Sequence, residues 1–475
     1  MKEKDRSPKI GLIGLTAELY QRKMLGLVKD LSRFSDELKR AVGKFAEVIH
    51  IPIVYTKVQM EETCAKLKKE NVDGIILIFL SYSPSLIIAP VLRKYEDIPI
   101  LLWNTQKLYT IDKKFKAYDT SLNHGMHGVQ DTANVLLREK IRFSLITGPY
   151  QDKEILTRVE KWCKVCSVIN LLKKARIGRI GGRFKDMGDF AVSDKNITEY
   201  LGPEIVDIPL AKIASESGKI SNNRIKELMA IDRKKFKVAS ELSEKVHFIS
   251  SRLELSLRRI IAKETLSGLG INFMGFKGDK GCEAIPFMAI GKFLAEGMGY
   301  AGEGDVLCAT SVLILQRLVG MANFVEMFTT DYKNNRILLM HMGESNPKMA
   351  KNKNSIKLVK KELKLVKPGL ATAMLLFPIR PGKATFFNIA SDENGKFKFI
   401  VAQGEVLDKP LFRDINSPHF LIRVPNVKDF LTQYSLAGGT HHLAMTYGDK
   451  KPELKYLADL MNILFIEICG SKLQK

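Results

Sequence analysis

The sequence predicts an α/β protein with two doubly wound α/β domains, N-terminal and central, followed by a β-rich antiparallel C-terminal domain. Three observations lead to this fold class. The chain has 475 residues, which at roughly 150 residues per domain corresponds to about three domains. Continuous apolar runs alternate with helical patterns through its first part, as in parallel sheets. From Ile337 onward the apolar runs are short and follow one another closely, which is typical of antiparallel strands.

The first 150 residues show the β-α repetition most clearly. Lys9–Leu15 is the first expected strand, and it is followed by an amphipathic helical stretch over residues 19–45. Further strands are expected at residues 48–53, 73–80, 98–103 and 143–147, and helices at 61–70 and 125–140. No G-x-G-x-x-G motif opens the first crossover, so the sequence gives no support for a dinucleotide site.

A second β-α region begins near Ala175. Its expected strands are residues 176–180 and 204–208, and residues 224–269 are expected to be mostly helical. The β-rich runs lie at residues 337–341, 371–376, 384–389, 397–402 and 420–424. Asn394-Gly395 separates two of these runs and is a strong hairpin-turn signal. A helix over residues 453–468 is expected to close the chain.

The chain is strongly basic, with 75 Lys and Arg against 52 Asp and Glu and a net charge of +23. Such a charge attracts nucleic acid, anionic membranes or anionic substrates. The densest basic segment, residues 348–367, contains no aromatic residue, whereas nucleic-acid sites usually combine basic and aromatic side chains. We therefore interpret it as a solvated surface loop or helix and expect no nucleic-acid partner.

Targeting signals and a disulfide framework are not indicated. The N-terminus has no small-residue cleavage site, and no stretch of about 20 residues is apolar without interruption. We expect a soluble, cytoplasmic protein without a membrane partner. Of the six cysteines, Cys163 and Cys166 form a C-x-x-C without a second pair at zinc-site spacing. They are interpreted as ordinary thiols on a helix.

Candidate metal ligands are concentrated in a few short motifs. His341 ends an apolar run, His442 closes the motif GGTHH, and Glu303 and Glu326 lie upstream in GYAGEGD and NFVEMFT. Two imidazoles and two carboxylates suit Mn²⁺ or a similar ion. The alternatives are a hydrogen-bonded core histidine at 341 and a turn or helix-capping role at 303. An ionised Glu326 between apolar residues is costly to bury without a partner. The spacings match no compact metal motif, so from the residues alone both interpretations remain open.

The blocks GMGYAGEGD, NFVEMFT, HMGESNP and GGTHHLAMTYGD resemble, in the same order, blocks of bacterial L-arabinose isomerases. L-Fucose isomerases share the general plan. Weaker likeness continues upstream in IGLTAELY, SYSPSL, LNHGMHGVQD and RFKDMGDFAV. The resemblance implies a flavodoxin-like N-terminal domain over residues 1–173 and a central α/β domain over 174–323 that carries Glu303. A β-rich domain over 324–475 would carry Glu326, His341 and His442.

The resemblance also implies a reaction and a metal centre. Glu303, Glu326, His341 and His442 would hold one divalent metal per active site, usually Mn²⁺, with Co²⁺ or Mg²⁺ as alternatives. The reaction would be reversible aldose–ketose isomerisation of a free sugar through an enediol, in which the metal stabilises the developing negative charge. Glu303 and Glu326 would act as general base and acid, with the two roles left unassigned. The family pattern favours the second histidine of the 441–442 pair as the ligand.

Substrate contacts follow from the same motifs. The implied residues are His127, Leu19, Tyr20, Tyr82, Met187, Phe276 and His441. The active sites would be shared between subunits of a trimer-based hexamer, with His127 reaching a neighbouring chain. Ala17 and His124 stand where the arabinose enzymes carry glutamines, and Tyr82 replaces a phenylalanine. These departures change which hydroxyl or anionic groups the pocket can satisfy, so a pentose, a hexose or a deoxy or anionic sugar stays open. A catalytically silent sugar-binding or regulatory protein is the alternative. Such a protein would be expected to lose Glu303 and Glu326 first, but the sequence retains both.

Overall fold

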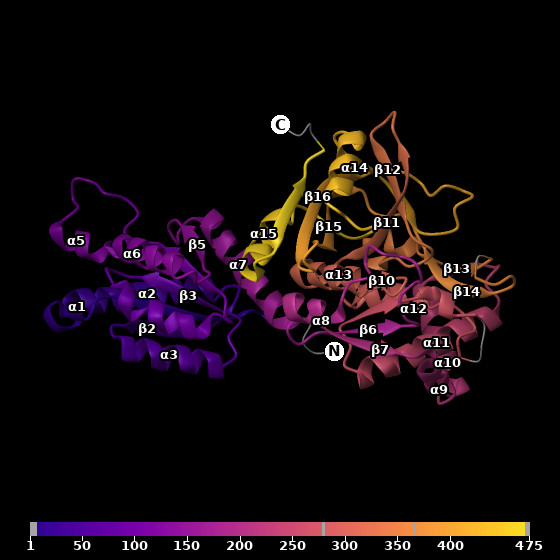
Figure 1. Ribbon diagram of the computed structural model, residues 1–475, viewed down its shortest axis with the longest axis horizontal. Helices are drawn as coiled ribbons and strands as arrows, with labels where there is room; N and C mark the ends of the chain where they lie inside the picture. Colours follow the sequence, from indigo (N-terminus) through magenta and orange to yellow (C-terminus); the bar gives the residue numbers. More distant parts are fainter. Residues whose placement is uncertain (1–6, 278–280, 365, 471–475) are drawn as a thin grey trace. The chain divides into compact units, whose positions relative to one another are not determined.

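The chain folds into two compact units, which are residues 1–171 with 455–462 and residues 172–454 with 463–475 (Figure 1). The computed structural model describes residues 7–277, 281–364 and 366–470. The predicted fold class is confirmed, because the N-terminal and central sheets are parallel and the large C-terminal sheet is antiparallel except for its last strand. The division into three domains stays a prediction, since the second unit contains both the central and the C-terminal sheets.

The first unit is a five-stranded parallel sheet with the strand order β2-β1-β3-β4-β5. Its strands are β1 (Lys9–Leu15), β2 (Glu47–Val54), β3 (Gly74–Phe79), β4 (Ile100–Asn104) and β5 (Ser144–Thr147). The order reverses between β1 and β3, and ligands of such folds bind beyond the carboxyl ends of the strands at this point. β3 is apolar throughout because both of its faces are buried.

Helices cover both faces of this sheet (Figure 1). α2 (Leu25–Val42) and α7 (Lys153–Leu172) contribute to the core on one face, and α3 (Lys57–Lys69), α4 (Ala89–Leu92) and α6 (Gly125–Arg138) to the core on the other. The helix expected over residues 19–45 is divided at Met24 into α1 (Glu18–Lys23) and α2. Cys163 and Cys166 lie on α7 as predicted, and burial raises the pKa of both thiols.

The second unit begins with a parallel sheet of order β10-β9-β6-β7. Its strands are β6 (Arg176–Ile180), β7 (Glu204–Ile208), β9 (Gly268–Ile271) and β10 (Gly299–Gly302). Its helices are α8 (Asp194–Asn196), α9 (Leu210–Ser217), α10 (Asn222–Lys235), α11 (Glu244–Lys263), α12 (Phe287–Ala295) and α13 (Val306–Val319). The stretch expected to be mostly helical over residues 224–269 is interrupted, because β8 (Lys237–Val238) separates α10 from α11 and β9 ends it.

The large antiparallel sheet has the order β15-β18-β11-β12-β17-β16-β19, and an additional β15–β16 pairing closes six of these strands into a ring (Figure 1). The strands are β11 (Asn323–Asp331), β12 (Arg336–Met340), β15 (Gly382–Ser391), β16 (Phe397–Val406), β17 (His419–Arg423), β18 (His442–Tyr447) and β19 (Leu464–Ile468). The predicted turn at Asn394-Gly395 joins β15 to β16, with Gly395 at φ 73°. α13, buried over residues 306–316, packs against both β10 and β18 and so joins the two sheets.

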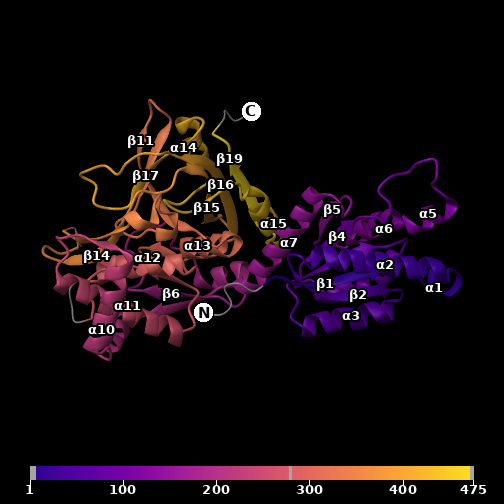
Figure 2. The same cartoon turned by 180° about the vertical axis from the view of Figure 1, so that it is seen from behind.

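Two predictions in this part of the chain are wrong. Residues 348–367 were expected to be a loop or helix, but β13 (Lys357–Glu362) lies within them and pairs with β14 (Ala371–Leu376). The helix expected over 453–468 stops as α15 (Lys451–Met461), because Asn462 adopts φ 55° and the apolar run after it forms β19. Figure 2 shows β19 beside β16, with which it pairs in parallel. Within the described ranges, no helix combines the length and the apolar character that crossing a membrane requires.

Candidate metal centre and active site

Glu303 lies directly after β10, at the carboxyl edge of the parallel sheet in the second unit. Its φ of 60° is left-handed, a conformation that is uncommon for residues other than glycine and is often found at functional sites. Gly304 follows at φ 78°, and a Cβ there would lie 2.2 Å from the carbonyl oxygen of Gly182. The Phe184 N–H donates to the Glu303 carbonyl oxygen at 2.9 Å. This tight turn against the loop after β6 fixes the Glu303 side chain, which is buried.

The antiparallel sheet brings Glu326 beside two of the predicted histidines. Glu326 on β11 stands directly opposite His442 on β18 and Met340 on β12. Residues opposite one another in antiparallel strands project from the same face of the sheet. His341 follows Met340, and the rings of His341 and His442 lie 4.7 and 4.8 Å from the ring of Phe324. Glu326 is partly buried, whereas both histidines are buried.

Glu303, His441 and His442 form a compact group whose candidate ligand atoms all lie within 4.8 Å of one another. The Nε2 atoms of His441 and His442 lie 3.3 and 3.5 Å from Glu303 Oε2. His442 Nε2 is buried and makes no hydrogen bond with any described residue. A buried nitrogen without a partner is costly. A divalent cation beside Glu303 would remove that cost, so the donor set fits a metal.

The predicted ligands are only partly within this group. Glu303 and His442 belong to it, and His441, which was expected to contact substrate, belongs to it as well. His341 lies beside the group, with its ring 5.9 Å from that of His442, and Glu326 neighbours His442 across the strands. The assignment of Glu303, Glu326, His341 and His442 as ligands therefore stays a prediction.

Three carboxylates that sequence reasoning missed hold these imidazoles. Asp305 Oδ2 lies 2.9 Å from His442 Nδ1, and Glu344 Oε2 lies 2.9 Å from His341 Nδ1. Asp189 Oδ2 lies 2.6 Å from His441 Nδ1. All three acids occur inside the motif blocks quoted above. Asp305 and Asp189 are 137 and 252 residues from their histidines, so the pairing could not be inferred from spacing.

The acids and imidazoles shift one another's pKa values. Burial opposes ionisation of Glu303, but the hydrogen bond with His441 and the charges of His442 and His341 hold the pKa of Glu303 below its ordinary value. Burial disfavours the charged form of His441, yet Asp189 and Glu303 raise its pKa to about 10. The pKa of Asp189 falls to about 2 because its hydrogen bonds with His441 outweigh burial. The centre therefore holds ionised carboxylates at neutral pH.

Comparison with known sequences assigns the chain to a family. Sequence models of the L-arabinose isomerase N-terminal, central and C-terminal domains match residues 7–174, 178–322 and 321–464. The chain belongs to the L-arabinose isomerase family. It is similar to L-arabinose isomerases of Bacteroides thetaiotaomicron (26% identity, covering 84% of this chain and 82% of that protein) and Aeromonas hydrophila (24%, 96% and 93%). It is thus a divergent member, as predicted, and it is an aldose–ketose isomerase, an intramolecular oxidoreductase.

Other resemblances add nothing to this assignment. A periplasmic solute-binding protein from Actinobacillus succinogenes with bound D-allose is matched with 13% identity over 66% of this chain and 92% of that chain. Its TM-score is 0.15, too low to indicate a shared fold. The likeness to L-fucose isomerases is untested by the family models and stays a prediction.

The substrate contacts expected from the family are divided between the two units. In the second unit Met187 is partly buried in the loop that carries Asp189, and Phe276 is fully buried after β9. In the first unit Leu19 and Tyr20 lie on α1, and Leu19 is exposed. Their roles stay predictions.

The positions that are expected to depart from the family pattern meet in the first unit. The Ala17 N–H donates to the Tyr82 carbonyl oxygen at 2.7 Å, which joins the loops after β1 and β3 at the point where the strand order reverses. The Tyr82 ring lies 6.0 Å from that of His124, and His124 Nε2 lies 2.6 Å from His127 Nδ1. His127 is exposed on the first turn of α6. We name Ala17, Tyr82, His124 and His127 the switch-point cluster.

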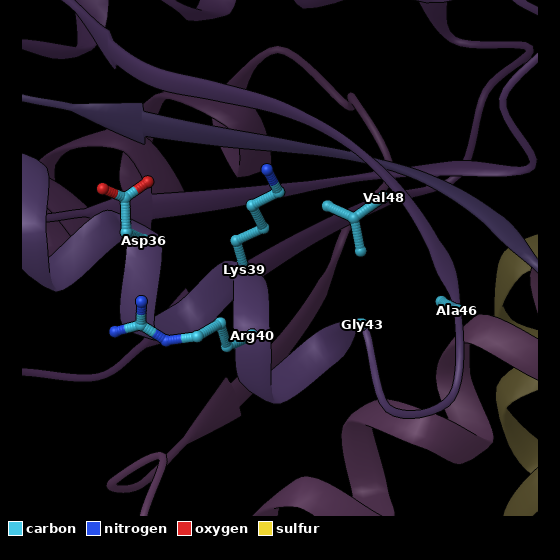
Figure 3. Close-up of a pocket in the computed structure, with 6 residues that line it drawn as sticks. All are labelled: Asp36, Lys39, Arg40, Gly43, Ala46 and Val48. Carbon is cyan, nitrogen blue, oxygen red and sulfur yellow. The ribbon is translucent and has the colours of Figure 1, made fainter.

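A hollow of about 510 Å³ lies elsewhere in the first unit (Figure 3). It is lined by Asp36, Lys39, Arg40, Gly43, Ala46 and Val48. These residues stand at the end of α2 and the start of β2, which is the amino edge of the parallel sheet. Ligands of such folds bind at the opposite, carboxyl edge. The hollow contains none of the predicted site residues and is not part of the candidate site.

Proposed function

We propose that this chain is a metal-dependent isomerase that interconverts a free aldose and its ketose through an enediol. The observation that carries the proposal is the buried centre of acids and imidazoles around Glu303, in a chain of the L-arabinose isomerase family. The His442 Nε2 atom, which no described residue satisfies, is its most specific feature.

The proposed metal ligands are Glu303, Glu326, His341 and His442. Two carboxylates and two imidazoles form a mixed oxygen and nitrogen donor set that suits Mn²⁺, with Co²⁺ or Mg²⁺ as alternatives. When bound, the metal supplies Lewis-acid stabilisation of the negative charge that develops on the sugar oxygens. His441 differs from the other imidazoles because its side chain is 31% exposed, so a sugar hydroxyl can reach it.

The chain's own groups move the protons. The C2 proton of an aldose is weakly acidic, so its removal needs a positioned base within hydrogen-bond reach. Glu303 Oε2 lies within 3.5 Å of the Nε2 atoms of His441 and His442 in the buried group, and we assign it as the acceptor of that proton. The electron pair of the C2–H bond then forms the C1=C2 double bond while the π electrons of the C1=O bond move onto O1, which gives the enediolate. Glu326 is assigned the transfer of the O2–H proton to O1. As O2 then forms a carbonyl with C2, the electron pair of the C1=C2 bond takes the proton back from Glu303 at C1, which gives the ketose. The Phe324 ring, packed on two imidazoles, keeps water from that side of the centre.

Substrate and assembly belong to the same proposal. L-Arabinose is the reference sugar for the assay, because the relatives are named L-arabinose isomerases. The switch-point cluster departs from the family pattern, so the screen includes hexoses, deoxy-sugars and anionic sugars. We further propose a cytoplasmic homo-oligomer, a trimer or hexamer, in which the first unit supplies His127 to the site of a neighbouring copy.

The test is ketose formation by the purified full-length protein with Mn²⁺ across this sugar panel. We expect Glu303→Gln and Glu326→Gln each to lower kcat at least about 10²-fold, the usual contribution of a general acid or base. The matched control is Glu405→Gln, because Glu405 pairs with Arg423 on the same sheet and both side chains are 53% exposed. Turnover without metal, or unchanged turnover in Glu326→Gln, would refute the proposal. Sugar binding without turnover would instead indicate the silent sugar-binding protein.

A further inference from the structure

The three imidazoles around Glu303 are all held through the same ring nitrogen. His442, His341 and His441 each bond a carboxylate through Nδ1. The histidines come from different places, since His341 follows β12, His441 ends the loop before β18 and His442 is the first residue of β18. A shared orientation in side chains from separate segments indicates a common requirement, which is that Nε2 faces the centre, as His441 Nε2 does at 3.3 Å from Glu303 Oε2.

Two of these carboxylates are themselves fixed in place. Asp305 Oδ1 accepts the Cys308 N–H at 2.8 Å and thereby caps α13, which leaves Oδ2 for His442. Glu344 Oε1 accepts the Tyr300 hydroxyl at 2.7 Å, and Oε2 accepts the Gly343 N–H at 2.8 Å. Both acids are almost fully buried, with 1% and 3% of their surface exposed. These hydrogen bonds and the burial therefore hold each carboxylate in place, with one oxygen facing an imidazole.

The consequence lies in the tautomer of each ring. An ionised carboxylate only accepts hydrogen bonds, so the Nδ1 atom that it faces must carry the proton. A neutral imidazole protonated at Nδ1 has its lone pair at Nε2. His442 Nε2 lies 3.5 Å from Glu303 Oε2, and the His341 ring lies against Gly302, next to Glu303. The lone pairs are thus directed towards the centre.

We propose that Asp305 and Glu344 are positioning residues that set the Nδ1–H tautomers of His442 and His341 and so present both Nε2 atoms to the metal. The inference rests on the proposed function, because it assigns a purpose to these bonds only if a cation binds at the centre. Carboxylates bonded to ligand imidazoles fix ring orientation and raise ligand basicity, and their loss typically weakens metal binding by 10–100-fold.

Asp305→Asn and Glu344→Gln test the proposal in the full-length protein. Asp305→Asn keeps an oxygen for the Cys308 N–H but turns an NH₂ donor towards His442, which shifts the ring proton to Nε2 and removes the lone pair. We expect each variant to bind Mn²⁺ about 10–100-fold more weakly by equilibrium dialysis. Glu405→Gln should bind it like the wild type. Thermal unfolding in EDTA checks that the variants fold. If Asp305→Asn does not fold, the Mn²⁺ affinity of Glu344→Gln decides whether the proposal holds.

A second readout is independent of the metal. In metal-free protein labelled with ¹⁵N-histidine, the shifts of the ring nitrogens should place the proton of His442 on Nδ1 in the wild type and on Nε2 in Asp305→Asn. Wild-type Mn²⁺ affinity in both variants, with the wild type itself binding, overturns the inference and leaves the proposed function standing. If the wild type binds no Mn²⁺, the proposed function fails. An unchanged tautomer in Asp305→Asn overturns the inference in either case.

Discussion

Replacing Gly302 by alanine tests the centre at the point where the backbone lies against the His341 ring. Gly302 ends β10 and precedes Glu303, and a Cβ there would lie 2.8 Å from His341 Cε1 and 3.2 Å from Nε2. Carbon atoms in ordinary contact are about 3.5–4.0 Å apart. The imidazole would have to move by at least about 0.7 Å. The ring is not a flexible chain end, because Glu344 holds its Nδ1 and the Phe324 ring packs against it edge to face.

Gly302→Ala is expected to lower both the stability of the protein and its catalytic rate. Overpacking a buried site destabilises a protein by about 1–3 kcal/mol, which lowers the thermal midpoint measurably. Displacing a catalytic group by about 1 Å can lower the rate about 10²-fold. We therefore expect Gly302→Ala to remain folded, to bind Mn²⁺ more weakly and to lose about two orders of magnitude in kcat/KM. Equilibrium dialysis, ketose formation and thermal unfolding measure the three effects separately.

Gly26→Ala is the matched control. Gly26 lies on α2 with nothing within 4 Å of an added Cβ and without positive φ, so alanine there should stabilise the helix by up to about 1 kcal/mol. Wild-type metal binding and turnover in Gly302→Ala would show that the position of the His341 ring is unimportant. The assignment of that ring to the centre would then be wrong.

Three further predictions concern charge and metal. Asp189→Asn should raise KM more than it lowers kcat in steady-state kinetics, because Asp189 orients the partly exposed His441. Chelation of the wild type with EDTA should lower its thermal midpoint, since a bound ion stabilises the folded state by mass action. Burial opposes ionisation of Asp232, but the hydrogen bond with His247 and the charge of Lys292 keep its pKa below the ordinary value. Its stabilisation is therefore present above about pH 4 and is lost as the pH falls through the lower folded pKa. Asp232→Asn should cost about 3–5 kcal/mol at pH 7 in urea unfolding, and the difference from wild type should narrow towards pH 3.

Strands with strong local patterns could be predicted from the sequence, and elements defined by distant partners could not. β6, β7 and β14 begin and end at their predicted residues. β13 was missed because three lysines interrupt its apolar pattern, and its pairing with both β14 and β8 places Leu358 and Val359 in a sheet where they are buried. β19 was merged with the preceding helix, since no local feature shows that its partner is β16.

For the candidate site, the sequence motifs predicted the candidate ligands but not the carboxylates that bond to them. The motif blocks contain Glu303 and His442, which the fold brings into one group. The tautomer of each histidine depends on which carboxylate faces it, and that is decided by the approach of loops far apart in sequence. Asp189 reaches His441 only because the loop after β6 lies over the turn at Glu303. Short motifs therefore identify candidate ligands but not the groups that orient them.

The residues proposed for the chemical step and the expected departures from the family pattern lie in different units. The second unit keeps every acid and imidazole that the resemblance implies for the metal and the proton transfers, and the hydrogen bonds described for that centre come from residues of the same unit. The departures at Ala17, Tyr82 and His124 lie together in the switch-point cluster of the first unit. An imidazole at His124 or a methyl group at Ala17, in place of a glutamine amide, alters which sugar hydroxyls the cluster can bond. It does not alter the pKa of Glu303 or the tautomer of His442. We therefore expect the isomerisation chemistry of the family to be retained and the sugar to differ, with restoration of glutamine at positions 17 and 124 shifting preference towards L-arabinose.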